Sequence, residues 1–279
     1  MKIESYTSMV AVVVPIYKPF KELTENEITA LLQMRSVLYS RDIYYVCPSS
    51  IDTGNYVKIL EPLNVGIIQA SERYFGSLDH GNRLFLSRFL YNRLRNYKYM
   101  LIHHTDAYVF SDQLDYWCSQ EFDYIGAPWF DGNKEPVLPL KFKGVGNGGF
   151  SLRKISSFLK ITNNRTFINF HLGLYRFHQL LEGNHYLFLR KYLGIDFAMS
   201  IMKLYIGQED EFWGLVVPKF YKWFNVAKPE QALKFSFEVA PEALLKLNND
   251  ELPFGCHAWD KYAPEFWKAF IHPVSSFVK

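Results

Sequence analysis

The residues best suited to chemistry lie in the apolar run Tyr99–Phe110, YMLIHHTDAYVF. The run has the pattern of a buried parallel strand that delivers one carboxylate, Asp106, to its open end, and ligands in open α/β sheets bind at such ends. Side chains two apart share a face of a strand, so His104 and Asp106 point one way while His103 and Thr105 point the other. The two histidines therefore cannot both serve one site. The plainer alternative is that Asp106 only caps a turn.

A second run of acids, Glu209, Asp210 and Glu211, precedes an apolar turn that ends at Pro218. Carboxylates are favoured at a helix N-terminus, so capping is the simplest explanation of this run. Much later in the chain, His257 follows a Gly-Cys pair. A lone histidine is more often structural than a ligand, so neither feature defines a site by itself.

The segment Gly144–Lys154, GVGNGGFSLRK, matches the pattern G-x-G-x-x-G at Gly144, Gly146 and Gly149. We reject a dinucleotide fingerprint, because the match follows a polar loop and no acid stands about 20 residues later. The segment still offers a backbone with almost no side chains, followed by a predicted strand at Phe150–Leu152 and a helix. A ligand could approach that backbone closely.

Composition narrows the class of protein. The 279 residues are 49% hydrophobic and 21% charged, which is ordinary for a packed globule, and 18% aromatic, which offers stacking surfaces. A net charge of +3 with mixed signs argues against a nucleic-acid partner. Three separated cysteines lack zinc spacing and suggest reduced thiols in a cytoplasm. The N-terminal apolar run, which Pro15 ends, is too short for a signal or a membrane span.

The order of predicted elements favours a parallel sheet. The run Met9–Ile16 is almost continuously apolar, as expected of a strand buried on both faces. A helix is expected at Thr24–Tyr39, because Thr24 and Glu27 have capping-box spacing and apolar residues recur with helical period. Further strands are expected at Asp42–Pro48 and Val65–Gln69. This spacing predicts parallel pairing through right-handed crossovers.

The rest of the chain is less regular. A single amphipathic helix at Asn82–Leu94 leads into the central run, and a short strand broken by proline follows at Tyr124–Trp129. The aromatic region Phe158–Tyr205 carries His171, His178 and His185 at intervals of seven. We interpret it as a variable insertion with an exposed aromatic face rather than a metal site. No repeat or linker is evident, so a single domain over residues 1–279 is expected.

Taken in order, seven segments resemble the GT-A glycosyltransferases, and most closely the group known as DUF5672. They are VVVPIY (Val12–Tyr17), FGSLDHGNRLFLS (Phe75–Ser87), HTDAYVF (His104–Phe110), DYIGAPW (Asp123–Trp129), GVGNGGFSLR (Gly144–Arg153), QEDEFWG (Gln208–Gly214) and PFGCHAW (Pro253–Trp259). Each motif alone is weak, but their order is specific and covers the chain. The Gly-rich block and the Glu-Asp pair also look like the β-1,4-galactosyltransferase arrangement.

The resemblance implies an α/β GT-A-like domain with a mostly parallel sheet flanked by helices and an aromatic-rich helical insertion at about 158–205. Residues 1–110 would form the nucleotide-binding half, and 111–279 the acceptor and catalytic half. A nucleotide-sugar donor, preferably a UDP-sugar, would lie near eight residues: Pro15, Tyr17, Lys18, Asn82, Arg83, Asp106, Gly148 and Gly149. The family's Asp-x-Asp metal motif is degenerate here, and the implied ligands of Mn²⁺ or Mg²⁺ are Asp106 and His257.

The resemblance also assigns catalytic roles. It maps an acid onto the Glu-Asp pair, and we expect Asp210 to be the base of an inverting transfer and Glu209 to bind the acceptor, with Glu211 in reserve. A helix N-terminus would keep the carboxylate ionised. If the transfer is retaining, Asp210 loses the base role. Trp129 or Trp213 could stack on a sugar face.

The expected function is hexosyl transfer to a hydroxyl of a glycan acceptor in bacterial surface polysaccharide synthesis. The expected location is the cytoplasm, and a lipid-linked acceptor would bring the chain to the inner face of the membrane. Two alternatives stay open: a non-catalytic nucleotide- or glycan-binding module on the same fold, and a sugar-phosphate nucleotidyltransferase. The latter would need a Gly-rich, basic loop after the first strand, where this chain has YKPFKE.

Overall fold

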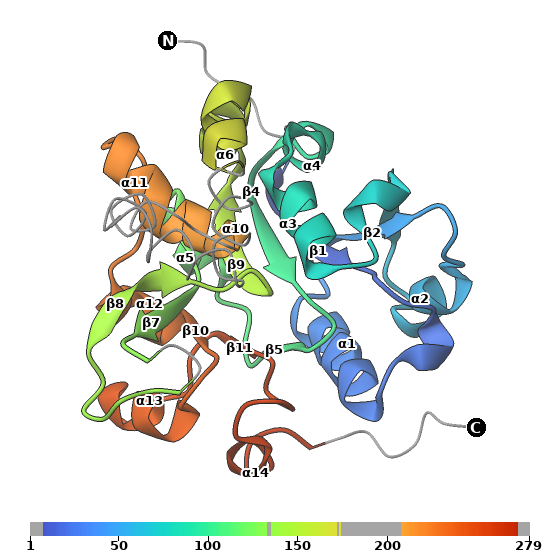
Figure 1. The fold of residues 1–279 in the computed structure, drawn as a ribbon. Coiled ribbons are helices and arrows are strands. Elements are labelled where there is room, and N and C mark those ends of the chain that lie inside the picture. Colours follow the sequence, from blue (N-terminus) through green and yellow to red (C-terminus); the bar gives the residue numbers. More distant parts are fainter. Residues whose placement is uncertain (1–7, 133–134, 172, 174–207, 273–279) are drawn as a thin grey trace, which may run out of the picture.

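The computed structural model describes residues 8–132, 135–171, 173 and 208–272. Its centre is a six-stranded sheet in the order β3-β2-β1-β4-β9-β6 (Figure 1). The strands are β3 (Val65–Ala70), β2 (Asp42–Pro48), β1 (Ser8–Pro15), β4 (Tyr97–His103), β9 (Phe150–Lys154) and β6 (Tyr124–Ile125). The first four are parallel, and β9 runs antiparallel to both β4 and β6. The expected α/β class and mostly parallel sheet are confirmed.

The apolar runs explain why β1 and β4 lie in the middle of the sheet. Val12 is fully buried and faces Ile43 of β2 on one side and Leu101 of β4 on the other. Helix α1 (Glu25–Val37) is preceded by the N-cap residue Thr24, and the side chains of Thr24 and Glu27 form the predicted capping box. The strand and helix predictions for this part of the chain are therefore confirmed to within a few residues.

The remaining helices surround the sheets. They are α2 (Gly54–Ile59), α3 (Leu78–Leu86), α4 (Arg88–Arg93), α5 (Leu114–Ser119), α6 (Ile155–Thr162), α10 (Glu209–Glu211), α11 (Val217–Phe220), α12 (Pro229–Phe235), α13 (Pro241–Leu247) and α14 (Pro264–Trp267). Short 3-10 turns lie at η1 (Phe20–Glu22) and η2 (Glu72–Tyr74), and a π-helical segment, η3 (Phe212–Val216), joins α10 to α11. Within the described residues, none of these helices has the length and apolar character needed to cross a membrane.

The run Tyr99–Phe110 is not one strand, which corrects the sequence interpretation. Strand β4 ends at His103, a turn follows, and β5 (Ala107–Val109) joins a different sheet with β11 (Gly255–His257) and β10 (Ser236–Phe237). The turn is closed by a backbone hydrogen bond from Ala107 N–H to the His104 carbonyl, 3.1 Å long. Because β5 pairs antiparallel with β11, Ala107 stands opposite His257. The turn therefore carries Asp106 to the C-terminal part of the chain.

The predicted single helix at Asn82–Leu94 is also wrong, because it is two helices. Helix α3 ends at Leu86 and α4 begins at Arg88, with Ser87 between them in an extended conformation. The Leu84 carbonyl accepts hydrogen bonds from both the hydroxyl and the N–H of Ser87, at 2.8 and 3.1 Å, so Ser87 closes the end of α3.

A two-stranded ribbon of β7 (Ala127–Phe130) and β8 (Phe142–Gly146) leads into β9. Its second strand, β8, takes up the end of the polar loop that precedes the Gly-rich segment in the sequence. Of the expected insertion at about 158–205, the structure describes only residues 158–171 and 173. His178 and His185 lie outside the described residues.

Candidate active site

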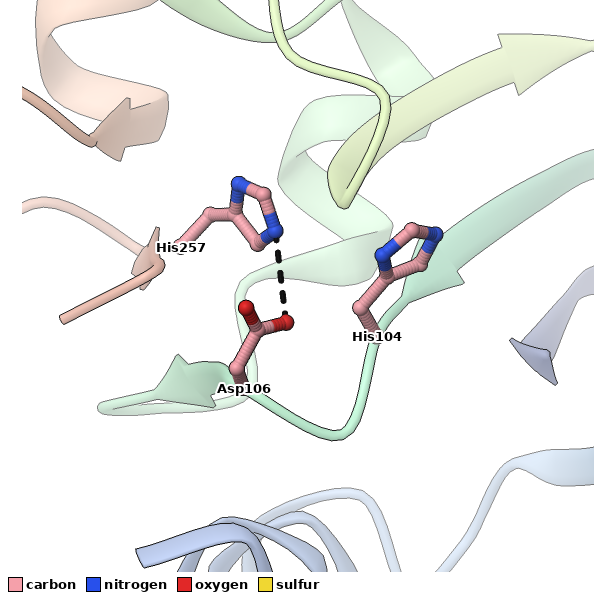
Figure 2. Close-up of side chains that lie close together, drawn as sticks. All are labelled: His104, Asp106 and His257. Carbon is pink, nitrogen blue, oxygen red and sulfur yellow. Dashed lines mark ion pairs between the residues drawn. The ribbon is translucent and has the colours of Figure 1, made fainter. Parts of the chain in front are cut away.

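Three side chains that could hold a metal ion meet where the central sheet approaches the second sheet. One possible ligand atom from each of His104, Asp106 and His257 lies within 4.8 Å of the other two (Figure 2). His104 and Asp106 come from the turn after β4, and His257 is the last residue of β11. The Nε2 atom of His257 lies 3.3 Å from Oδ1 of Asp106. The predicted pair of Asp106 and His257 is thus brought together, and His104 joins it.

The surroundings determine the charge of each ligand. Burial, followed by the nearby charge of His257, lowers the pKa of His104 to about 3, so its ring is neutral and ready to coordinate. Burial opposes the charged form of Asp106, but His257 outweighs it and holds the pKa of that carboxyl well below its usual range. Burial likewise disfavours a charged His257, yet Asp106 and Glu238 together hold the pKa of that imidazole well above its ordinary value.

Glu238 orients His257 from behind. Its Oε1 lies 3.0 Å from Nδ1 of His257, which leaves Nε2 directed at Asp106. A carboxylate on the outer nitrogen of a histidine is the common second partner of a metal-ligating imidazole. His104 supplies an independent sign, because its Nε2 atom is buried without a hydrogen-bond partner. The donor set therefore fits a divalent cation such as Mn²⁺, which accepts both carboxylate and imidazole.

The Gly-rich loop after β8 packs against His257 of the possible metal site and against Glu209 of α10. A Cβ atom at Gly149 would lie 2.0 Å from Nε2 of His257, and one at Gly148 would lie 2.7 Å from Oε1 of Glu209. No side chain fits at either position without a shift. The sequence led us to expect a ligand close to this backbone, and the groups that the structure places there are the side chains of His257 and Glu209.

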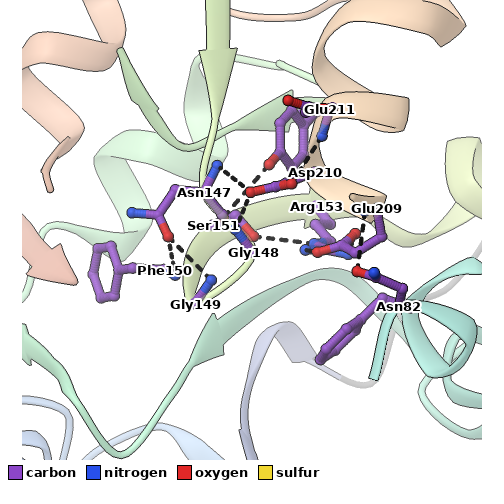
Figure 3. Close-up of polar contacts among 12 residues, drawn as sticks. Asn82, Asn147, Gly148, Gly149, Phe150, Ser151, Arg153, Glu209, Asp210 and Glu211 are labelled. Atoms are coloured by element: carbon purple, nitrogen blue, oxygen red, sulfur yellow. Dashed lines mark hydrogen bonds and ion pairs between the residues drawn. The ribbon is translucent and has the colours of Figure 1, made fainter. Parts of the chain in front are cut away.

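Asn147 shapes this loop. Its backbone has a positive φ of 109°, and its Oδ1 accepts hydrogen bonds from the N–H groups of Gly149 and Phe150, at 3.0 and 3.1 Å. An asparagine side chain that binds the backbone ahead of it stabilises such a turn. The turn aims the N–H groups of Asn147 and Gly148 at one oxygen of Asp210, at 3.2 and 3.0 Å (Figure 3).

Asp210 is buried, with 8% of its surface exposed. Its other oxygen accepts a 2.9 Å hydrogen bond from the N–H of Glu211. These N–H groups favour the carboxylate, but burial and then the charges of Glu209, Glu238 and Glu211 raise the pKa of Asp210 to about 7. The expectation that the helix N-terminus keeps this group fully ionised is therefore wrong. A group with this pKa is suited to take up a proton near neutral pH.

Glu209 is committed to a buried ion pair. Both of its oxygens accept hydrogen bonds from Arg153, at 2.8 and 2.9 Å, and the Arg153 side chain has no exposed surface. Arg153 also donates to the hydroxyls of Ser151 and Tyr91. The structure thus places Glu209 as a support that ties α10 to β9, where the sequence interpretation expected an acceptor-binding group.

Two cavities meet at the metal-ligand cluster. The larger, of about 490 Å³, is lined by Asp210, His257 and Glu238 and by the glycines of the loop after β8. The smaller, of about 260 Å³, is lined by Asp106, Lys18 and Tyr56 together with other residues of the β1 end. Tyr17 and His104 line both cavities. A ligand that extends through both would pass the three possible metal ligands.

Most of the predicted site residues lie around these cavities. Pro15, Tyr17 and Lys18 line the smaller one, and Asn82, Gly148 and Gly149 line the larger one. Lys18 is paired with Glu27 at 2.7 Å. Asn82 accepts the N–H of Glu209 at 3.2 Å and so anchors α10.

Two predicted residues lie elsewhere. Arg83 is exposed and lines a separate cavity on the other side of α3. Trp213 is fully buried, so it cannot stack on a sugar. Trp129 is partly exposed beside Asp210, in a small recess of about 50 Å³.

Three participating residues were missed by the sequence interpretation. His104 was placed on the same face as Asp106 but was not counted as a ligand. Glu238 gave no signal, because nothing near it in the sequence suggests that β10 pairs with β11. Asn147 was visible as the one polar residue inside the Gly-rich run, and its preference for a left-handed turn was the available clue.

A sequence profile described as "Protein of unknown function (DUF5672)" matches residues 64–257. The chain belongs to the DUF5672 family. The resemblance found in the ordered motifs is thereby confirmed for the family. Among curated proteins, no sequence matches this DUF5672 chain.

Several solved glycosyltransferases are similar to this DUF5672 protein in structure. The glycosyltransferase GlyE of Streptococcus pneumoniae TIGR4 is 14% identical with a TM-score of 0.49, over 94% of this chain and 60% of that one. Mouse xyloside xylosyltransferase 1 is 8% identical with a TM-score of 0.48, over 90% and 97% of the two chains. The galactosyltransferase LgtC is 11% identical with a TM-score of 0.49, over 91% and 87%. The matched part spans less than two thirds of GlyE.

Proposed function

We propose that this DUF5672 protein is a metal-dependent glycosyltransferase that moves a sugar from a nucleotide-sugar donor to a hydroxyl of a glycan acceptor. The observation that carries the proposal is the position of His104, Asp106 and His257 at the junction of two cavities. A nucleotide sugar has the same order of parts, because a charged diphosphate separates the nucleoside from the sugar. The smaller cavity would take the nucleoside and the larger one the sugar and acceptor.

The cation would be held by His104, Asp106 and His257 and would neutralise the charge of the leaving diphosphate. Of the two ions considered, Mn²⁺ suits this set better than Mg²⁺, because two of the three ligands are imidazoles. Glu238 would keep the His257 ring in its binding orientation. Glu27, which accepts hydrogen bonds from both Lys18 and Thr105 at 2.7 Å, would hold the β1 and β4 ends in register around the nucleoside.

Asp210 is the proposed base. It lies in the wall of the larger cavity, and a pKa of about 7 lets it accept the proton of the acceptor hydroxyl. Three backbone N–H groups donate hydrogen bonds to the carboxylate oxygens of Asp210. The carboxylate is therefore held by the backbone rather than by other side chains, which are more flexible. This assignment supports inversion at the sugar, because direct displacement needs one base and one leaving group.

The proposed donor is a UDP-sugar, and the proposed acceptor is a bacterial surface glycan made at the cytoplasmic side of the membrane. These parts of the proposal rest on the order of the seven motifs rather than on the geometry of the cavities.

Calorimetric titration with UDP and with GDP, each with and without Mn²⁺, tests the metal and donor parts together. We expect UDP to bind only with Mn²⁺, and Asp106→Asn to remove that binding. Asp250→Asn is the matched control, because Asp250 is exposed and has a left-handed φ of 60° that asparagine tolerates. Nucleotide binding that does not need Mn²⁺ would exclude the three residues as metal ligands. If neither nucleotide binds, a non-catalytic glycan-binding module is favoured over the enzyme.

A further inference from the structure

A third cavity, of about 490 Å³, lies outside the catalytic site and is strongly basic. Four arginines line it: Arg73, Arg83, Arg88 and Arg165. They come from four different segments, namely η2, α3, α4 and the stretch after α6. These elements pack together, and α3, α4 and α6 lie side by side in Figure 1. No carboxylate is among the described residues that line this cavity.

Among the described residues, none of these four guanidinium groups is paired with an acid. Arg73 donates a hydrogen bond to the hydroxyl of Tyr74, at 2.9 Å. The molecule as a whole has a net charge of only +3, so four arginines around one cavity are a strong local concentration of positive charge. Like charges repel, and an arrangement of this kind is stabilised when an anion binds between them.

The rest of the lining shows what kind of anion fits. The rings of Tyr74 and Phe89 stack with centroids 6.3 Å apart, and Arg73 lies over the Tyr74 ring at 4.8 Å. Leu86 and Ile168 add apolar surface. Arginine forks match phosphate oxygens in pairs, while the aromatic and apolar wall suits an attached ring or hydrocarbon. A small inorganic anion would leave that wall unused.

Helix α3 separates this arginine cavity from the catalytic cavity. Gly81, Asn82 and Phe85 of α3 line the catalytic side, whereas Arg83 and Leu86 line the arginine side. A helix with its side chains is about 10–12 Å wide. A group held by the arginines would therefore be remote from the reacting atoms but within the reach of one extended substrate.

We propose that the arginine cavity binds the phosphate group of a phosphate-bearing acceptor, so that the acceptor hydroxyl reaches Asp210 across α3. The inference rests on the proposed glycosyl transfer and specifies its acceptor class. Remote binding of this kind contributes to positioning without touching the chemistry. Arg83, expected from sequence to contact the donor, belongs instead to this acceptor subsite.

Titration of the full chain with inorganic diphosphate, in EDTA so that no divalent ion is present, tests the cavity directly. We expect Arg88→Gln/Arg165→Gln to weaken diphosphate binding about tenfold or more, which is about 1.4 kcal/mol. The matched control is Arg95→Gln/Lys219→Gln, which removes the same charge at two exposed positions outside the cavity. Equal weakening in both double variants, or none in the first, overturns the proposal.

Competition with lipid vesicles distinguishes a lipid-linked acceptor phosphate from a soluble one. Neutral phosphatidylcholine vesicles that carry a polyprenyl phosphate should displace diphosphate if the acceptor is lipid-linked, and a soluble phosphorylated oligosaccharide should displace it if the acceptor is free. Either result supports the cavity. Displacement by phosphatidylglycerol vesicles to the same degree in wild type and Arg88→Gln/Arg165→Gln would show general membrane electrostatics and overturn it.

UDP binding with Mn²⁺, measured on the same variants, keeps this test apart from the proposed function. It should be unchanged in Arg88→Gln/Arg165→Gln. If UDP binds with Mn²⁺ while the arginine variants bind diphosphate normally, only the acceptor inference fails. If UDP and Mn²⁺ do not bind to the wild type, the proposed function fails whatever the arginines do.

Discussion

At the scale of single residues, Gly149 is tied to the metal-ligand cluster by its lack of a side chain. In Gly149→Ala the added methyl would have to displace the ring of His257, because its Cβ would lie 2.0 Å from Nε2. We expect Mn²⁺ affinity to fall about 10–100-fold, as it does when a ligand loses its orientation. Gly173→Ala is the control, since a Cβ there meets no atom of the described residues within 4 Å. Unchanged Mn²⁺ affinity in Gly149→Ala, measured by calorimetry, would contradict the cluster.

Asp210 makes a pH dependence predictable. If it is the base, activity should rise with pH through about 7 and then level off, because only the carboxylate accepts a proton. Asp210→Asn should lower the rate of transfer about 10²–10⁴-fold and leave UDP and Mn²⁺ binding nearly intact. Initial rates of UDP release across the pH range provide the measurement. An Asp210→Asn variant with wild-type rates would remove Asp210 from the mechanism.

The same residue affects stability with a definite sign. The pKa of Asp210 is raised from about 3.9 in the unfolded chain to about 7 in the folded one, so the folded state binds the proton more tightly. Its contribution to the free energy of unfolding is therefore full below about pH 3.9 and is lost as pH rises through 7. Chemical denaturation at pH 5 and at pH 8 gives the free energy of unfolding at each pH. Its decline from pH 5 to pH 8 should be smaller in Asp210→Asn than in wild type. An equal decline would mean that Asp210 titrates normally.

At the scale of elements, the Arg153–Glu209 pair joins β9 to α10 inside the core. Arg153→Met leaves a buried charge on Glu209 unpaired and should cost about 3–5 kcal/mol of unfolding free energy. Arg153→Met/Glu209→Leu should recover much of that loss, because no buried charge is left over. The exposed pair of Lys268 and Glu265 is the control, and Lys268→Met should cost about 0–1 kcal/mol. Urea denaturation of these three variants and the wild type provides the measurement. An Arg153→Met cost as small as that of Lys268→Met would contradict the structural role of the pair.

Elements whose pattern is local were predictable from sequence. The buried strands β1, β2 and β3 and helix α1 follow from apolar runs and from the capping box at Thr24. The errors arose where partners distant in sequence decide the structure. The turn at His104–Asp106 depends on the pairing of β5 with β11, which lies about 150 residues later, and no local pattern reveals it. The role of Glu238 was hidden for the same reason.

The site residues also fall into two groups: those that sequence motifs identify, and those whose roles depend on partners distant in the sequence. Asp106, His257 and Asp210 were chosen as candidates because an ordered set of motifs pointed to them, and the structure places all three at the two cavities. Glu209 was assigned to the acceptor because its partner, Arg153, cannot be recognised from sequence as a buried cation. Arg83 was assigned to the donor because one helix carries residues for two cavities, and only the structure shows that α3 divides them.

At the scale of the whole molecule, the proposed ligands come from distant parts of one chain. The cation would join the turn after β4 to β11, and the nucleoside would contact the end of β1. Any ligand that binds only the folded state stabilises it, by about 2.7 kcal/mol at 100 times its dissociation constant. For a chain of this size that is a rise in melting temperature of about 5 °C. UDP with Mn²⁺ should produce this rise in wild type and in Arg88→Gln/Arg165→Gln, and Asp106→Asn should abolish it. The rise is measured by thermal melting. An equal rise in Asp106→Asn would show that the nucleotide binds without this cluster and that no metal joins the two cavities.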